Sequence, residues 1–236
     1  MAKIKKHPKF DGIYYSYRGN TQAFYTKNLD VGNTIYGERT QYYKGKELRK
    51  WDPNRSKLCA ALTKNARNIY FTKNSNCLYL GASSGTTVSH ISDILTEGII
   101  YAVEFAPRSI RELVQNTENR KNIIPILADA KKPVEYARYI VGAVDIVYED
   151  VAQPDLTEIG IANCKKFLTS GGIFIMAIKA RSIDVVSSPK DIYVQEIDKL
   201  KEENFEILEE INLSPYSQDH LVVISRYFEN TGEYNK

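Results

Sequence analysis

The stretch from Cys77 to Glu104, CLYLGASSGTTVSHISDILTEGIIYAVE, indicates the fold of this chain. A short apolar run at 77–80 leads directly into a turn that contains two glycines, and a polar-capped amphipathic segment follows. A second apolar run then ends on the carboxylate of Glu104. A strand, a glycine turn, a helix, a second strand and an acid, in this order, are typical of the first half of a doubly wound α/β nucleotide site.

The turn does not match the two common phosphate-binding motifs. A dinucleotide fingerprint needs its glycines at other offsets, and Ser83 and Thr86 occupy two of those positions. A P-loop needs a Gly-Lys-Ser/Thr sequence, which does not follow here. The glycines still let the backbone pass close under a ligand, and an acid about 20 residues further on suits a ribose diol. The pattern therefore predicts a nucleoside ligand without a pyrophosphate, and S-adenosylmethionine is the commonest one that fits.

Strands and helices alternate through the remainder of the chain. Apolar runs predict strands near 77–82, 99–105, 123–128, 145–150 and 172–179. Helical patterns lie near 86–96, 107–119, 133–140, 155–168 and 189–203. Two final β-rich runs, at 205–213 and 220–228, are separated by a turn too short for a crossover helix, so they should be antiparallel. The predicted fold class is α/β, with a mostly parallel seven-stranded sheet whose last strand is antiparallel.

Residues 1–54 are predicted to form a small β-rich domain, separate from an α/β domain at 55–236. The first part shows short strand patterns and frequent turns, and a helical pattern begins only near 55–65. Residues 1–57 carry 13 Lys and Arg against 5 Asp and Glu, with seven of the 17 tyrosines. Basic residues interleaved with aromatic ones attract phosphate, but tyrosine and lysine are also common at exposed sheet edges. The segment is thus expected either to contact RNA or to dock a protein partner.

Composition places the chain among ordinary globular proteins. It has 236 residues, of which 43% are hydrophobic and 26% charged, and no apolar run approaches the roughly 18 residues of a membrane span. The N-terminus lacks the apolar core of a signal peptide, and the last eight residues are expected to fray. The three cysteines are widely spaced, which suits a reducing cytoplasm and predicts neither a disulfide framework nor a metal site.

Four consecutive predicted strands end in ionisable residues. Ligands of open α/β sheets bind at the carboxyl ends of the strands. The ends read, in chain order, Gly81-Ala82-Ser83, Glu104-Phe105, Asp129-Ala130, Glu149-Asp150-Val151-Ala152-Gln153 and Lys179-Ala180-Arg181. A helix cap would explain one such group, but four in series favour a binding site.

The first three strand ends suit the nucleoside. Glu104 is expected to accept hydrogen bonds from both ribose hydroxyls, and Phe105 to offer an apolar face to the adenine. Asp129 would accept from the adenine amino group while the Ala130 amide donates. Asp129 also has an alternative interpretation as the cap of the helix after Pro133.

The reactive groups are expected at the last strand ends. Asp150 and Lys179 end neighbouring strands, so together they can position a hydroxyl and remove its proton. The alternative is a partly exposed ion pair that contributes little to stability. His220 opens the last strand at the same edge of the sheet. His90 is interpreted as a packing residue and His7 as part of a terminal tail.

These strand ends resemble those of the fibrillarin family of box C/D ribonucleoprotein methyltransferases. The resemblance runs from Gly12 to Phe228, and the matching stretches are 52–58 (DPNRSKL), 78–90 (LYLGASSGTTVSH), 101–105 (YAVEF), 129–130 (DA), 150–154 (DVAQP) and 178–184 (IKARSID). It implies a class I methyltransferase fold with a small N-terminal β-domain, and methyl transfer from S-adenosylmethionine to the 2′-oxygen of RNA ribose. Ser83 stands where the family usually has alanine, and the arginine-glycine-rich extension of eukaryotic members is missing, which indicates an archaeal form.

The resemblance also implies roles for individual residues. The catalytic set falls on Lys57, Asp150, Lys179 and His220, with Asp219 competing with His220 for the fourth role. In this set Lys57 is expected to hold either the phosphate or the Asp150 side chain. With the glycine loop and the residues beside Asp150 included, the expected cofactor contacts are Gly81, Ser83, Gly85, Thr86, Thr87, Glu104, Phe105, Asp129, Ala130, Asp150, Val151, Ala152 and Gln153.

A net charge of +3 is low for an enzyme that must select its RNA target unaided. The resemblance implies that a guide RNA makes the selection, and that the partners are the box C/D guide RNA, target rRNA or tRNA, a Nop-type scaffold and a kink-turn-binding, ribosomal-protein-like subunit. No membrane partner is expected. Two alternatives remain open. A stand-alone methyltransferase of proteins or small molecules would not require Lys57, and a non-catalytic RNA-binding subunit would not bind S-adenosylmethionine.

Overall fold

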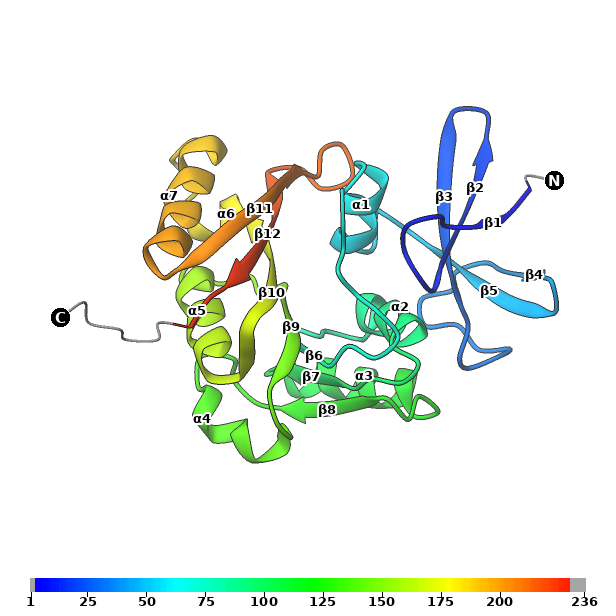
Figure 1. The fold of residues 1–236 in the computed structure, drawn as a ribbon, viewed down its shortest axis with the longest axis horizontal. Coiled ribbons are helices and arrows are strands. Elements are labelled where there is room, and N and C mark those ends of the chain that lie inside the picture. Colours follow the sequence, from blue (N-terminus) through cyan, green and yellow to red (C-terminus); the bar gives the residue numbers. More distant parts are fainter. Residues whose placement is uncertain (1–2, 230–236) are drawn as a thin grey trace.

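The computed structural model describes residues 3–229 and contains two β-sheets (Figure 1). The N-terminal sheet is antiparallel, with the strand order β1-β2-β3-β5-β4. Its strands are β1 (Lys5–Lys6), β2 (Ile13–Arg18), β3 (Thr21–Lys27), β4 (Thr40–Tyr43) and β5 (Lys46–Trp51). The predicted β-rich character of this segment is confirmed, while the proposed domain boundary after residue 54 stays a prediction.

The second sheet has seven strands in the order β11-β12-β10-β9-β6-β7-β8. They are β6 (Cys77–Leu80), β7 (Ile100–Glu104), β8 (Ile123–Leu127), β9 (Val144–Glu149), β10 (Leu168–Lys179), β11 (Phe205–Asn212) and β12 (His220–Tyr227). β12 runs antiparallel to both of its neighbours, and the other pairings are parallel. The predicted sheet, including its antiparallel last strand, is confirmed.

Helices cover both faces of this sheet. They are α1 (Lys57–Thr63), α2 (Thr86–Ile94), α3 (Pro107–Thr117), α4 (Pro133–Tyr136), a 3₁₀ turn (Ala137–Tyr139), α5 (Leu156–Phe167), α6 (Ala180–Ile183) and α7 (Pro189–Glu202). Successive strand residues alternate between two apolar clusters: Tyr79 packs with α1–α3, whereas Leu78 and Leu80 pack with α4, α5 and α7. Burial on both faces explains the continuous apolar strands. The exception is the edge strand β8, where Ile124 and Leu127 are exposed.

Two sequence expectations need correction. The helix predicted near 133–140 is divided into α4 and the 3₁₀ turn, and α6 was not predicted. His7 is not a terminal tail residue, because its ring stacks on Phe10 at 4.5 Å and accepts hydrogen bonds from the backbone amides of Lys9 and Phe10. The fraying expected of the last eight residues falls, apart from residue 229, outside the described residues. Within the described part, no helix combines the length and apolarity needed to cross a membrane.

The N-terminal sheet is fastened to α2 by a buried network of charges. Asp93 of α2 accepts hydrogen bonds from Arg49 Nε of β5 at 3.0 Å and from Arg120 Nη1 at 2.6 Å, and all three side chains are fully buried. Arg49 also pairs with the buried Glu38. Two cations thus face two anions, so no buried charge is left without a partner.

The packing role predicted for His90 is confirmed. Its ring lies against Trp51 of β5, with ring centroids 4.9 Å apart, and Thr26 and Tyr36 are its hydrogen-bond partners. Burial, reinforced by the nearby guanidinium groups of Arg49 and Arg120, lowers the pKa of His90 well below its ordinary value. The ring is therefore neutral at physiological pH and adds no charge to the network.

The substitution Asp93→Ala is expected to destabilise the protein by about 3–5 kcal/mol, because it leaves buried guanidinium groups without their shared anion. The measurement is the free energy of unfolding from denaturant titration. Asp11→Ala removes the exposed pair with Lys6 and serves as the matched control, with almost no expected change. Similar losses for the two variants would show that the buried network does not hold the sheet in place.

Candidate functional site

Two adjoining cavities open at the carboxyl edge of the seven-stranded sheet. One has a volume of about 400 Å³ and the other about 490 Å³. Both are lined by the end of β6 and the end of β9, through the shared residues Gly81, Ser83, Asp150, Val151 and Ala152. The structure therefore brings the predicted strand ends together at one place.

The larger cavity collects the residues expected to bind the nucleoside. Besides the shared residues, it is lined by Glu104, Phe105, Asp129, Ala130 and Gln153. Phe105 is 64% exposed as a residue. An aromatic ring left open at a cavity wall is a suitable stacking face for a base. We refer to this space as the nucleoside cavity.

Glu104 is held rigidly at the floor of the nucleoside cavity. Its Oε2 accepts a hydrogen bond from the Ser83 amide at 2.8 Å, and its Oε1 accepts from the Ala106 amide at 2.9 Å. The residue is only 7% exposed. Each carboxylate oxygen retains a further lone pair, so both can also accept from a vicinal diol.

Asp129 does not cap the following helix. Its Oδ1 accepts from the Lys131 amide at 3.0 Å, and α4 begins after Lys132 without a side-chain cap. The alternative interpretation of Asp129 as a helix cap is therefore wrong. Its carboxylate lies in the wall of the nucleoside cavity instead.

The glycine loop approaches β9 closely because Gly81 has no side chain. Its φ is 82°, and a Cβ added there would lie 2.7 Å from the carbonyl oxygen of Asp150. Gly85 lines neither cavity. It begins α2 with φ 95°, and a Cβ at this position would lie 2.8 Å from Leu113 Cδ1. The first glycine brings the loop to Asp150, and the second packs α2 onto α3.

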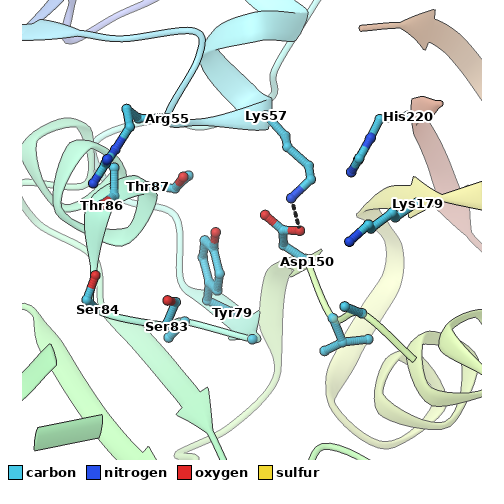
Figure 2. Close-up of a pocket in the computed structure, with 14 residues that line it drawn as sticks. Arg55, Lys57, Tyr79, Ser83, Ser84, Thr86, Thr87, Asp150, Lys179 and His220 are labelled. Atoms are coloured by element: carbon cyan, nitrogen blue, oxygen red, sulfur yellow. Dashed lines mark hydrogen bonds and ion pairs between the residues drawn. The ribbon is translucent and has the colours of Figure 1, made fainter. Parts of the chain in front are cut away.

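The smaller cavity is lined by the four residues of the predicted catalytic set, and Figure 2 shows their side chains directed toward a common space. Lys57 Nζ lies 2.5 Å from Asp150 Oδ1, with side-chain exposures of 23% and 20%. Lys179 ends β10, next to β9, and is paired in register with His220 of β12. We refer to this space as the catalytic cavity.

Asp150 forms its ion pair with Lys57, as one of the two roles expected of this lysine requires, and not with Lys179. Over residues 3–229, Lys179 takes part in no ion pair, and its exposed ammonium group points toward the catalytic cavity (Figure 2). The alternative interpretation as a Lys179–Asp150 surface pair is therefore wrong. One lysine neutralises Asp150, and the other is available to a ligand.

Lys57 is positioned by the start of α1. Ser56 caps this helix, since its Oγ accepts from the Cys59 amide at 3.4 Å. The same hydroxyl accepts from Thr87 Oγ1 at 3.0 Å, which ties the start of α1 to the start of α2. The lysine thus reaches Asp150 from a helix start that is anchored to the start of α2.

Of the two candidates for the fourth role, His220 is the one that lines the catalytic cavity. Asp219 pairs with Arg181 at 3.1 Å, and its backbone oxygen accepts from the Ala180 amide. Burial of His220 lowers its pKa below the usual value, and the positive charges of Lys57 and Lys179 act in the same direction. His220 Nδ1 lies 2.5 Å from the carbonyl oxygen of Gln218 and donates to it, so Nε2 of the neutral ring is left as an acceptor.

Glu149 differs sharply from its neighbour Asp150. Its side chain is fully buried, and neither carboxyl oxygen has a hydrogen-bond partner among the described residues. Burial, with the charges of Asp150, Asp155 and Glu158, raises the pKa of Glu149 well above its ordinary value. Glu149 is therefore a neutral interior acid, and Asp150 supplies the charge at this strand end.

Sequence reasoning missed several lining residues. Arg55, Tyr79 and Ser84 line the catalytic cavity, and Lys131 lines the nucleoside cavity. Arg55 stands two positions before Lys57 in the matching stretch 52–58, so this motif is the signal that could have found it. Over residues 3–229, no group of three or more His, Cys, Asp or Glu side chains is placed to hold a metal ion.

Comparison with known proteins gives a consistent result. The family model described as "Fibrillarin" matches residues 4–229. The fibrillarin-like rRNA/tRNA 2′-O-methyltransferase of Methanosarcina barkeri is 51% identical over 229 residues, which cover 96% of this chain and 99% of the relative.

Solved structures show the same similarity. A Methanococcus jannaschii fibrillarin pre-rRNA processing protein has a TM-score of 0.92 at 44% identity, over 96% of this chain and 98% of its own. Aeropyrum pernix fibrillarin, solved with natively bound S-adenosyl-L-methionine, has a TM-score of 0.87 at 42% identity, over 95% and 99%. A fibrillarin/Nop5p complex gives 0.79 at 38% identity, over 87% and 94%.

The substitution Glu104→Gln is expected to weaken binding of S-adenosylmethionine about tenfold or more, because a charge-assisted hydrogen bond contributes roughly 1.5–3 kcal/mol. Titration calorimetry measures the affinity, and circular dichroism checks the fold. Glu112→Gln, at an exposed acid paired with Arg108, is the matched control and should bind like the wild type. Unchanged affinity in Glu104→Gln would remove this residue from the cofactor site.

Proposed function

The chain belongs to the fibrillarin family, and from this premise we propose that it is the catalytic subunit of a box C/D ribonucleoprotein. It transfers a methyl group from S-adenosylmethionine to the ribose 2′-hydroxyl of rRNA and tRNA, under the direction of a guide RNA. The observation that carries the proposal is the position of Lys57, Asp150, Lys179 and His220 in a cavity that adjoins the nucleoside cavity.

The residues of the nucleoside cavity fit this cofactor. Glu104 would offer two fixed carboxylate oxygens to the ribose, and Phe105 and Asp129, which line the same cavity, would contact the adenine ring and its amino group. S-adenosylmethionine supplies an electrophilic methyl group on a positively charged sulfur. Gly81 lines both cavities, and its missing side chain lets the loop lie directly against Asp150 where the two cavities meet.

The catalytic residues act on the RNA hydroxyl. A ribose hydroxyl is a poor nucleophile at neutral pH, so it must be aligned with the methyl group and relieved of its proton. Asp150, held by Lys57, accepts the hydroxyl hydrogen bond and orients the oxygen. Lys179 stabilises the negative charge that develops on that oxygen. Neutral His220 accepts the released proton through Nε2.

The assembly supplies recognition that the chain lacks. Residues 58–236 carry 19 Lys and Arg against 24 Asp and Glu, so the catalytic part has no general attraction for RNA. The particle is completed by a Nop-type scaffold, a kink-turn-binding subunit and the guide RNA. The similar fibrillarin/Nop5p complex supports the scaffold.

Three buried free cysteines and archaeal relatives support a location in the archaeal cytoplasm. Residues 1–54 form the smaller of two domains in this proposal.

Lys179→Ala and Asp150→Ala are expected to reduce single-turnover methylation by a factor of about 100 or more, as removal of a positioned acid–base group does. Lys179→Ala should leave the affinity for S-adenosylmethionine nearly unchanged, because this lysine acts on charge that exists only in the transition state. Rapid-quench kinetics and calorimetry give the two quantities. A parallel loss of affinity and rate would instead make Lys179 a binding residue.

Methylation of target RNA by the isolated chain is expected to be negligible, and robust activity should require the scaffold, the kink-turn subunit and the guide RNA. A tritium-methyl assay with stepwise addition of the partners measures this dependence. Mapping of the product should place the methyl group on the one nucleotide that the guide selects, and a changed guide should move it. Efficient, guide-independent methylation by the chain alone would contradict this proposal and favour the alternative of a stand-alone methyltransferase.

A further inference from the structure

Three hollows follow one another from the catalytic cavity to the outside of the N-terminal sheet. The catalytic cavity shares Arg55 with a hollow of about 450 Å³, which is also lined by Tyr36, Gly37, Glu38, Arg39, Lys50 and Asp52. That hollow shares Arg39 and Lys50 with a third one of about 390 Å³, which extends to Arg18. The two outer hollows therefore lie side by side along the N-terminal sheet and begin next to the catalytic cavity at Arg55, and we refer to these two hollows as the path.

Four cations line this path: Arg18, Arg39, Lys50 and Arg55 are exposed, and within residues 3–229 none of them is in an ion pair. The path contains two acids. Glu38 is buried against Arg49, and Asp52 is engaged by the amide and side chain of Asn54. The free charge along the path is thus predominantly positive.

The cations are held in a defined order by the sheet. The Lys50 amide in β5 donates to the carbonyl oxygen of Arg39, the residue that precedes β4, at 2.9 Å. Tyr36 donates its hydroxyl hydrogen to the Lys50 carbonyl oxygen at 3.0 Å, and the Arg55 guanidinium lies 5.7 Å from the centre of the Tyr36 ring. Arg18 and Lys50 are thus carried by strands, and Arg39 and Arg55 are held next to β5 by these contacts.

We propose that this basic path binds the phosphodiester backbone of the target RNA strand where the strand leaves the catalytic cavity. The inference rests on the proposed function, because the path begins at the cavity that must hold the target ribose. Three of the four cations are arginines, whose planar guanidinium groups match phosphate in a bidentate manner. The Tyr36 ring beside Arg55 also offers a face on which a sugar or base can pack.

The test compares two double variants of the same sheet. Arg39→Ala/Lys50→Ala removes the centre of the path. Lys27→Ala/Lys46→Ala is the matched control, because these lysines are exposed on the same sheet and line a separate cavity with no residue in common with the path. Each variant is assembled with scaffold, kink-turn subunit and guide RNA, and binding of a fluorescent target RNA is followed by anisotropy between 50 and 200 mM salt.

The path variant is expected to bind target RNA about tenfold more weakly. Its slope of log affinity against log salt should fall by about 1.4, since two phosphate contacts on a single strand contribute roughly 0.7 each. The control should stay within about twofold of the wild type on the same electrostatic argument. Single-turnover methylation at saturating RNA should be unchanged, because neither residue touches the catalytic set.

Equal binding by the two variants would overturn the inference. So would a loss of scaffold affinity, measured by calorimetry, in the path variant alone, because it would assign this surface to an acidic protein partner. Anisotropy needs no methyl transfer, so its result is independent of the enzymatic activity. A wild-type assembly that binds target RNA but does not methylate it would refute the proposed function and leave the RNA path standing.

Discussion

The buried carboxylate of Asp93, which lies between Arg49 and Arg120, determines how the two sheets of this protein act as one body. Charges in the interior are tolerated only in a fixed geometry, since any displacement leaves one of them unpaired. Asp93 belongs to α2, Arg49 to β5 and Arg120 to the turn after α3, so three parts of the chain meet at one group. Because the other end of α2 carries Thr87, the same helix also fixes Ser56 and the start of α1. The position of Lys57 over Asp150 therefore depends on contacts at both ends of α2.

Much of the nucleoside cavity could be predicted because its residues occupy the ends of parallel strands. The strands are apolar throughout and bounded by turns, so their carboxyl ends can be recognised, and the topology brings these ends to one edge. Glu104, Asp129 and Asp150 were found in this way. Gly85 shows the limit of the argument, because a glycine that opens a ligand loop and one that packs a helix against its neighbour look alike in sequence. The difference is set by Leu113, which lies in another helix.

The catalytic contacts depend on tertiary structure and were less accessible. Lys57 and Asp150 are 93 residues apart, and no local pattern indicates that the lysine of α1, rather than Lys179, neutralises the aspartate. The choice between Asp219 and His220 depends on Arg181, which draws the aspartate away from the cavity. The resemblance to the fibrillarin family supplied the set and left Lys57 to hold either a phosphate or Asp150, and in the structure Lys57 pairs with Asp150. Neither the sequence pattern nor the family resemblance predicted the hollows beside Arg39 and Lys50, because these hollows arise where β4, β5 and the loop before them meet.

Glu149 and Asp150 explain how one strand end combines a neutral interior with a charged surface. Glu149 is enclosed by α5 and β10, where a Cβ added at Gly160 would lie 2.4 Å from its Oε2 and 2.3 Å from Phe174, so the acid is held protonated by burial. One residue later the chain leaves the sheet and Asp150 meets Lys57. A second ionised carboxylate beside Asp150 would repel an RNA backbone and compete for the same lysine. Burial of Glu149 avoids this competition, so Lys57, Lys179 and Arg55 keep a positive excess around a single aspartate. That excess lies where the acidic catalytic part of the chain meets the basic N-terminal sheet, which is where an RNA ribose and its flanking phosphates must be held together.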